Sequence, residues 1–401
     1  MNDNLPAGRV PELARGLGGA EFPGRTAPLG DAAVGDAGDA AAAPVVYSPK
    51  ADLNVWAAGA VVACVAVATV IAWASGASMR DFFTKLGYLA AFLPIFYGAC
   101  ALVQMTVTRP KTRYVIIGSF ATFAFLIALI GIFNLTVPGM TSDPENQRRS
   151  GTLLLIVAGA TFIPMFKRVR LLLGRITPID PNSTVDISGV IVALWIAIAL
   201  ITALVSVDLE AIAAETNITV SDSLITTLAY PALGFALVGI WITRNPREAV
   251  KRLGLERITL QQVGISIGMI VPLLIFGLGL DAIGRVLQPD LYAKLERVLE
   301  SMSSNVTNPF IALIIGFSAG IGEEILFRGA IQPRLGIWFT AFLFAIAHTQ
   351  YGLSFGVLGV FLIGIVLGYQ RRYMNTTSAI ITHGVYNTVA FLAAYYTGNG
   401  G

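Results

Sequence analysis

The sequence predicts an all-α fold, a polytopic transmembrane helical bundle. Of the 401 residues, 55% are hydrophobic and only 13% are charged, whereas charged residues make up about 25% of a typical soluble domain. Many apolar runs approach 20 residues, the length that crosses a bilayer core of about 30 Å as a helix. A transmembrane β-barrel would instead show alternating segments of about 10 residues. We therefore expect an integral, multi-pass membrane protein.

Eleven apolar segments follow one another along the chain, so we expect about ten to eleven spans. The fourth and the ninth are short for complete spans. The segments are 54–75, 83–105, 114–136, 151–167, 187–206, 222–243, 260–281, 309–332, 336–348, 354–370 and 377–396. Residues 1–50, before them, are rich in Ala, Gly, Pro and Asp, which predicts a disordered tail. This tail lacks the apolar stretch of a signal peptide.

Basic residues recur after every second apolar segment. Arg109 and Lys111 follow the second segment, and Arg371 and Arg372 follow the tenth. Since such residues mark cytoplasmic loops, the N-terminal tail is expected in the cytoplasm and the spans in a cell membrane, of bacterial type. The net charge of +3 does not indicate nucleic acid as a partner. The expected surroundings are the lipid bilayer.

Between the seventh and eighth segments, residues 290–300 predict a short amphipathic helix. Leu291, Leu295 and Val298 recur at helical spacing with charged residues between them. Such a helix either lies on the membrane surface or packs on the bundle as a cap, and the sequence leaves both alternatives open.

Two adjacent carboxylates and a guanidinium interrupt the eighth apolar segment. These are Glu323, Glu324 and Arg328. Charged groups are costly in a bilayer, so they face the bundle interior or a wet cavity and commonly mark function. Glu324 and Arg328 lie one helical turn apart and are expected to neutralise each other. Glu323 points about 100° away from Glu324, so it is the carboxylate left to act as a general base.

The chain has only two histidines, and both lie in apolar segments near this stretch. Phe344 and His348 are one turn apart in the ninth segment, and His383 and Asn387 are one turn apart in the eleventh. A single histidine in a membrane helix has a plain alternative role, donating to a backbone carbonyl at a helix contact. Here both histidines of the chain lie in such segments. Together with the acid pair and an intramembrane asparagine, they favour one functional site.

Three motifs in this order resemble the CPBP family, the group of the type II CAAX prenyl endopeptidase and its bacteriocin-processing and immunity relatives. They are Glu323-Glu324-Ile325-Leu326-Phe327-Arg328, Phe344-Ala345-Ile346-Ala347-His348 and His383-Gly384-Val385-Tyr386-Asn387. The resemblance covers about 260–396. It implies an intramembrane endopeptidase that hydrolyses peptide bonds of membrane-tethered or membrane-inserted proteins.

The resemblance also implies a role for each motif residue. Glu323 would activate water with help from His348, and Glu324 and Arg328 would support the site. His383 and Asn387 would hold the water or a metal and stabilise the oxyanion. We therefore divide the chain into a disordered cytoplasmic tail (1–50), an N-terminal transmembrane bundle of unassigned role (51–257) and a CPBP-like protease domain (258–401).

The involvement of a metal is left open by these residues. Glu323, His348 and His383 would supply the three protein ligands of a catalytic zinc site. However, the sequence contains no His-Glu-x-x-His motif, and a glutamate that binds the metal cannot also be the free base. A divalent metal such as zinc and a metal-free glutamate mechanism therefore remain as alternatives.

Two other classes of function compete with the protease. One is a non-proteolytic membrane scaffold or immunity protein of the same fold, for which Glu323 would be dispensable. The other is a secondary transporter that couples ions or protons to Glu323, Arg328 and the histidines. A transporter would be expected to show inverted repeats, and the polar residues instead crowd into the last third of the sequence.

Overall fold

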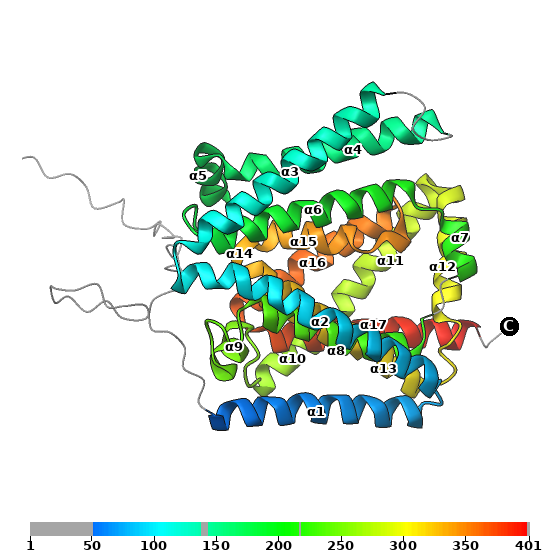
Figure 1. The fold of residues 1–401 in the computed structure, drawn as a ribbon. Coiled ribbons are helices and arrows are strands. Elements are labelled where there is room, and N and C mark those ends of the chain that lie inside the picture. The colour runs from blue at the N-terminus through cyan, green and yellow to red at the C-terminus, as the bar shows by residue number, and fades with distance from the viewer. Residues whose placement is uncertain (1–50, 138–142, 216–217, 399–401) are drawn as a thin grey trace, which may run out of the picture. The chain divides into compact units, whose positions relative to one another are not determined.

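The computed structural model describes residues 51–137, 143–215 and 218–398, which belong to one compact unit spanning Ala42–Gly401. The predicted disordered tail, 1–50, lies outside the described residues. Regular structure in the described part is helical throughout, apart from one isolated bridge between Ile240 and Arg244. The all-α prediction is therefore confirmed. The long helices lie side by side with roughly parallel axes (Figure 1).

Seven helices among the described residues are long and apolar enough to cross a membrane. An eighth span results if α4 (Pro144–Phe162), η1 (Ile163–Met165) and α5 (Lys167–Ile176), bent by 83°, form one broken span. These helices indicate a multi-pass integral membrane protein. The seven are α2 (Met79–Thr108), α3 (Thr112–Thr136), α6 (Thr184–Ser206), α8 (Val220–Leu237), α10 with α11 (Leu260–Gly268 and Ile270–Leu287), α13 with its extension (Pro309–Leu335) and α16 (Phe355–Tyr373).

The predicted count of ten to eleven spans is not shown, although each of the eleven apolar segments corresponds to a helix. Helix α15 (Ile337–Ile346) has 10 residues, so it is about 15 Å long, half of a bilayer core. The fourth segment bends just after Pro164, whose ring interrupts the helical hydrogen bonds. Helices α1 (Ala51–Ala74) and α17 (Thr376–Gly398) complete the set.

Helices α13 (Pro309–Glu324) and α17 cross at very short range. A Cβ atom at Gly320 would lie 2.7 Å from the backbone nitrogen of Gly384, and one at Gly316 would lie 2.6 Å from the backbone nitrogen of Thr388. Two glycines four residues apart are the pattern that lets membrane helices approach closely. The crossing brings the C-terminal end of α13 against the middle of α17.

Helix α8 packs along the other side of α13, although it precedes the predicted domain boundary at 257–258. A Cβ atom at Gly322 would lie 3.2 Å from the carbonyl oxygen of Thr226, and one at Gly234 would lie 3.3 Å from the side chain of Ile325. The helix that carries the acid pair therefore lies between α8 and α17. The division into 51–257 and 258–401 stays a prediction, and these contacts cross it.

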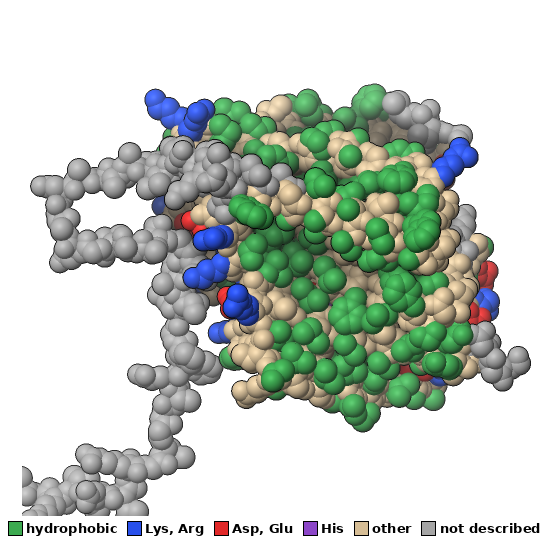
Figure 2. Space-filling model, turned by 90° about the horizontal axis from the view of Figure 1, so that it is seen from below, with side chains coloured by type: hydrophobic (Ala, Val, Ile, Leu, Met, Phe, Trp, Pro, Cys, Tyr) green, Lys and Arg blue, Asp and Glu red, His purple; other side chains and the backbone are tan. Residues whose placement is uncertain are grey.

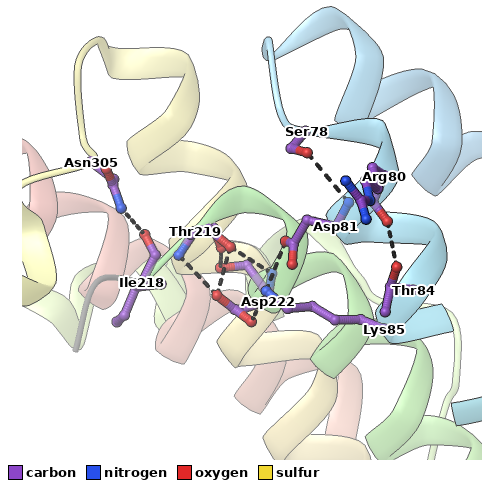
Figure 3. Close-up of polar contacts among 10 residues, drawn as sticks. Ser78, Arg80, Asp81, Thr84, Lys85, Ile218, Thr219, Asp222 and Asn305 are labelled. Atoms are coloured by element: carbon purple, nitrogen blue, oxygen red, sulfur yellow. Dashed lines mark hydrogen bonds and ion pairs between the residues drawn. The ribbon is translucent and has the colours of Figure 1, made fainter. Parts of the chain in front are cut away.

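Charged side chains join the N-terminal ends of α2 and α8 (Figure 3). The Nζ atom of Lys85 lies 2.8 Å from an oxygen of Asp81 and 2.7 Å from an oxygen of Asp222. Nearby, the side-chain amide of Asn305 donates to the carbonyl of Ile218 at 3.2 Å. These contacts connect the start of α8 both to α2 and to the loop that precedes α13.

The predicted amphipathic segment forms α12 (Pro289–Ser303), and it packs as a cap. Its apolar face is buried, with Val298 fully enclosed. Its charged face pairs with the neighbouring α7 (Leu209–Glu215), where Lys294 lies 3.3 Å from Glu210. Of the two alternatives left open by the sequence, the structure shows the cap, because the apolar side chains face protein.

Hydrophobic side chains are spread over the face seen in Figure 2, and Lys and Arg side chains lie at its edges, with the larger group at one edge. This edge is the end at which α9 (Pro246–Arg252) lies in Figure 1, and we call it the basic end. The C-terminus lies at the opposite end. An apolar face with basic side chains at its border is typical of a protein that crosses a bilayer.

Candidate active site

The acid pair lies where α13 changes from an α-helix to a π-helix. Helix α13 ends at Glu324, the segment η2 (Ile325–Ile331) has π geometry, and α14 (Gln332–Leu335) continues the chain. A π segment accommodates an extra residue per turn and is frequent at functional sites. The apolar pattern predicts one uninterrupted span here, so the π-helix is a feature that the sequence did not reveal.

Glu324 is fully buried and contacts two partners of basic type. Its Oε2 lies 3.3 Å from Nε of Arg328, and its Oε1 lies 2.9 Å from Nδ1 of His383 on α17. The side chains of Glu324 and Arg328 are both 0% exposed, so each charge depends on the other for compensation. The expected Glu324–Arg328 pair is present, and the contact with His383 is an additional finding.

The guanidinium of Arg328 is held by two further groups. It stacks on the ring of Phe344 at 4.1 Å from the ring centre, and its Nη2 donates to the carbonyl of Gly364 at 3.3 Å. A planar, delocalised cation suits such a stack. The same ring contacts both imidazoles, with centroid distances of 4.7 Å to His348 and 5.9 Å to His383. Phe344 therefore positions three site residues at once.

Glu323 is the carboxylate that both histidines face. Its Oε2 lies 3.9 Å from Nε2 of His348 and 3.9 Å from Nε2 of His383. This oxygen is buried and accepts no hydrogen bond from the described residues. A separation of 3.9 Å is too long for a direct hydrogen bond and suits a bridge through one water molecule. Two predicted histidines from separate segments thus converge on one oxygen atom of the predicted glutamate.

The hydrogen bonds at Nδ1 determine which imidazole nitrogen serves the site. Nδ1 of His348 lies 2.7 Å from the carbonyl oxygen of Phe344, which can only accept, so this nitrogen carries the hydrogen. Nδ1 of His383 similarly donates to the carboxylate of Glu324. In their neutral forms, both rings therefore present an unprotonated Nε2 toward Glu323.

Asn387 lies one turn beyond His383 on α17 and is half-buried. Its side chain forms no hydrogen bond with any described residue. The structure therefore brings five of the six predicted site residues into direct contact or ion-pair range. It places Asn387 beside them only through its helical spacing from His383.

Part of the chain that contains these residues matches a known family. Residues 305–389 match the family model described as "Type II CAAX prenyl endopeptidase Rce1-like". The chain contains an Rce1-like domain. A search of curated proteins and a search of solved structures each returned no match. The Rce1-like match includes the whole range from Glu323 to Asn387, and it confirms the resemblance drawn from the three motifs.

Two tyrosines beside the candidate site are not singled out by the sequence. Tyr351 ends the short η3 (Thr349–Tyr351), and its ring centre lies 6.3 Å from that of His348. Tyr230 on α8 packs against Gly322, where a Cβ atom would lie 3.5 Å from its side chain. The position of Tyr351, three residues after His348, is a feature of the sequence that could have identified it. Tyr230 lies outside the Rce1-like match, and only the packing of α8 on α13 reveals it.

The Rce1-like domain offers donor atoms of the kind that zinc binds, one carboxylate and two imidazoles. The Nδ1 contacts of both rings also resemble those of metal-bound histidines. However, both Nε2 atoms face the Glu323 oxygen itself, and no group of three or more His, Cys, Asp and Glu within the described ranges is arranged to hold a metal. The donor chemistry is that of a zinc site, and a metal at these residues stays a prediction.

Proposed function

We propose that the chain is an intramembrane endopeptidase that hydrolyses peptide bonds of membrane-tethered or membrane-inserted proteins. The observation that carries this proposal is the convergence of His348 and His383 on Oε2 of Glu323 within a bundle of membrane helices. Peptide hydrolysis in lipid requires an activated water and polar groups supplied by the protein. The Rce1-like domain supports the same class of reaction.

Glu323 and His348 would activate the water together. A water between Oε2 of Glu323 and Nε2 of His348 donates one hydrogen to each and directs a lone pair toward the substrate carbonyl carbon. As its oxygen attacks, one proton moves to Glu323 and a tetrahedral oxyanion forms. When the C–N bond breaks, Glu323 returns that proton to the leaving amine.

His383 and Asn387 would stabilise the oxyanion. The amide of Asn387 has two hydrogens to donate and no partner among the described residues. A protonated His383 would offer Nε2–H while Glu324 holds its other nitrogen. One such donor is typically worth about 3–4 kcal/mol in the transition state. Glu324 and Arg328 act as positioning residues, because they fix the ring of His383.

The membrane arrangement extends the proposal. Helices α1, α15 and α17 would lie in the membrane beside the candidate spans and bring the count to ten or eleven. The basic end would face the cytoplasm together with the N-terminal tail. A divalent ion such as zinc, if required, would be held by Glu323, His348 and His383 and would supply Lewis-acid polarisation of the carbonyl.

The test follows cleavage of a panel of membrane-tethered peptides by purified protein in lipid vesicles. Glu323→Gln keeps the shape of the side chain and removes the base, so cleavage should fall at least about 100-fold. The matched control is Glu145→Gln, at an exposed glutamate on α4, which should cleave like the wild type. Each protein is assayed with and without a chelator, so the same series decides the metal question.

Two outcomes would contradict the proposal. Undiminished cleavage by Glu323→Gln would show that the mechanism is wrong. If no protein cleaved any substrate while Glu323→Gln still complemented a deletion strain, the chain would be a non-proteolytic scaffold of the same fold.

A further inference from the structure

We infer that the basic end of the bundle carries a binding site for an anionic phospholipid, between α1 and α9. A hollow of about 370 Å³ opens there, lined by Trp56, Arg247, Val250, Lys251, Leu255 and Glu256 among others. These residues take no part in the candidate active site and lie outside the Rce1-like match.

Arg247 and Lys251 present two uncompensated positive charges to this hollow. They lie four residues apart on α9, so their side chains share one face of the helix. Both are exposed, and neither side chain has an ion-pair or hydrogen-bond partner in the described parts of the chain. Arg and Lys in this state are ready donors for a phosphate group.

The protein behind α9 adds to the positive potential. Burial, together with the charges of Arg334, Arg244 and Arg371, lowers the pKa of Arg252 to about 10. Arg334 is paired with Asp186, which offsets one of these charges. Arg244 and Arg371 interact electrostatically with Glu248 and Glu256. Arg252 remains as an excess positive charge behind the exposed Arg247 and Lys251, and such an excess attracts anions.

The apolar lining selects a lipid over a free phosphate ion. Trp56 is 77% exposed and Val250 is 37% exposed, and with Leu255 they offer a wall on which an acyl chain can lie. Tryptophan is typical of the membrane–water interface, and basic pockets between membrane helices on the cytoplasmic side suit anionic headgroups. The carboxylate of Glu256 repels a phosphate group. Arg371 interacts electrostatically with Glu256 and offsets that negative charge.

The first experiment measures lipid retained by the full chain in native mass spectrometry, with phosphatidylglycerol or phosphatidylcholine as the probe. The wild type should retain phosphatidylglycerol preferentially. The double variant Arg247→Gln/Lys251→Gln should bind it about tenfold more weakly or worse, since each interfacial cation contributes about 1 kcal/mol. Both side chains are exposed, so the thermal midpoint should not change.

The matched control is Lys167→Gln/Arg168→Gln, which removes the same charge from exposed positions on α5 and should bind like the wild type. Equal losses in both double variants, or none in either, would overturn the site. A second measurement uses phosphatidylglycerol with brominated acyl chains, which should quench a fluorescence component that Trp56→Phe removes. If the component of Trp56 is not quenched, no acyl chain lies in the hollow.

Discussion

At the scale of single residues, Glu324 has two tasks. It compensates the buried charge of Arg328, and it accepts a hydrogen bond from His383. Breaking a buried ion pair by removing one partner typically costs 3–5 kcal/mol, whereas replacing both with apolar groups is often neutral. The two tasks can therefore be separated by comparing a single variant with a double variant.

The variant Arg328→Met should lose about 3–5 kcal/mol of stability, because it leaves the Glu324 carboxylate uncompensated. The double variant Glu324→Met/Arg328→Met should recover most of that stability but still cleave poorly, because His383 loses the group that orients it. Thermal midpoints in detergent and cleavage rates measure the two effects. A stable double variant with full activity would show that the contact between Glu324 and His383 is not needed.

Asn387 is assigned to the site only by its helical spacing from His383, so its role needs a direct test. The variant Asn387→Leu, of similar size, should lower kcat by about 10²–10³ with little change in KM, because the donor acts on the transition state. Thr397→Val on the same helix serves as the control, and its hydroxyl bonds only to carbonyls of its own helix. A large rise in KM with unchanged kcat would assign Asn387 to substrate binding instead.

At the scale of elements, the crossing of α13 and α17 builds the site. Glu324 and His383 are 59 residues apart in the sequence and meet because Gly316, Gly320 and Gly384 let the two backbones approach. The neighbouring helix α8 closes the other side of α13 at Gly322. Any side chain at these glycines must push the helices apart.

Gly320→Ala should therefore destabilise the protein by about 1–3 kcal/mol, the usual cost of overpacking, and should reduce cleavage by displacing His383 from Glu324. The control is Gly264→Ala on α10, where nothing lies within 4 Å of the new Cβ atom. That variant should be neutral or slightly more stable, because alanine favours a helix. Equal behaviour of the two variants in thermal unfolding and cleavage would mean that the close crossing does not determine the site.

At the scale of the whole molecule, the charge distribution predicts an orientation in the membrane. The basic end holds α9 and its surrounding arginines, and α12 lies toward the other end (Figure 1). Basic residues stay on the cytoplasmic side, so the two ends should be accessible from opposite sides of the membrane.

Single cysteines test this orientation in a background with Cys64→Ala and Cys100→Ala. In intact cells, a membrane-impermeant thiol reagent should label Asp290→Cys at once and Arg257→Cys only after lysis. Both positions are exposed, so a difference in labelling reports sidedness. The reverse pattern would place the N-terminal tail outside the cytoplasm.

The sequence by itself determined the class of fold, and it predicted which residues form the candidate site. Long apolar runs report helices in lipid, since the bilayer core sets their length. Glu323, His348 and His383 stand out because polar groups in such runs are costly, and their motif order predicted the family. The sequence reveals these signals because each of them depends only on one helix and the lipid around it.

The tertiary structure decided how these residues meet. The Nδ1 contact of His383 with Glu324, the stacking of Arg328 on Phe344 and the approach of Tyr230 all join different helices. Apolar periodicity records which face of a helix is buried, but not which helix covers it. The packing of α12 as a cap likewise depends on the helices beside it, and the π geometry of η2 appears only in the structure.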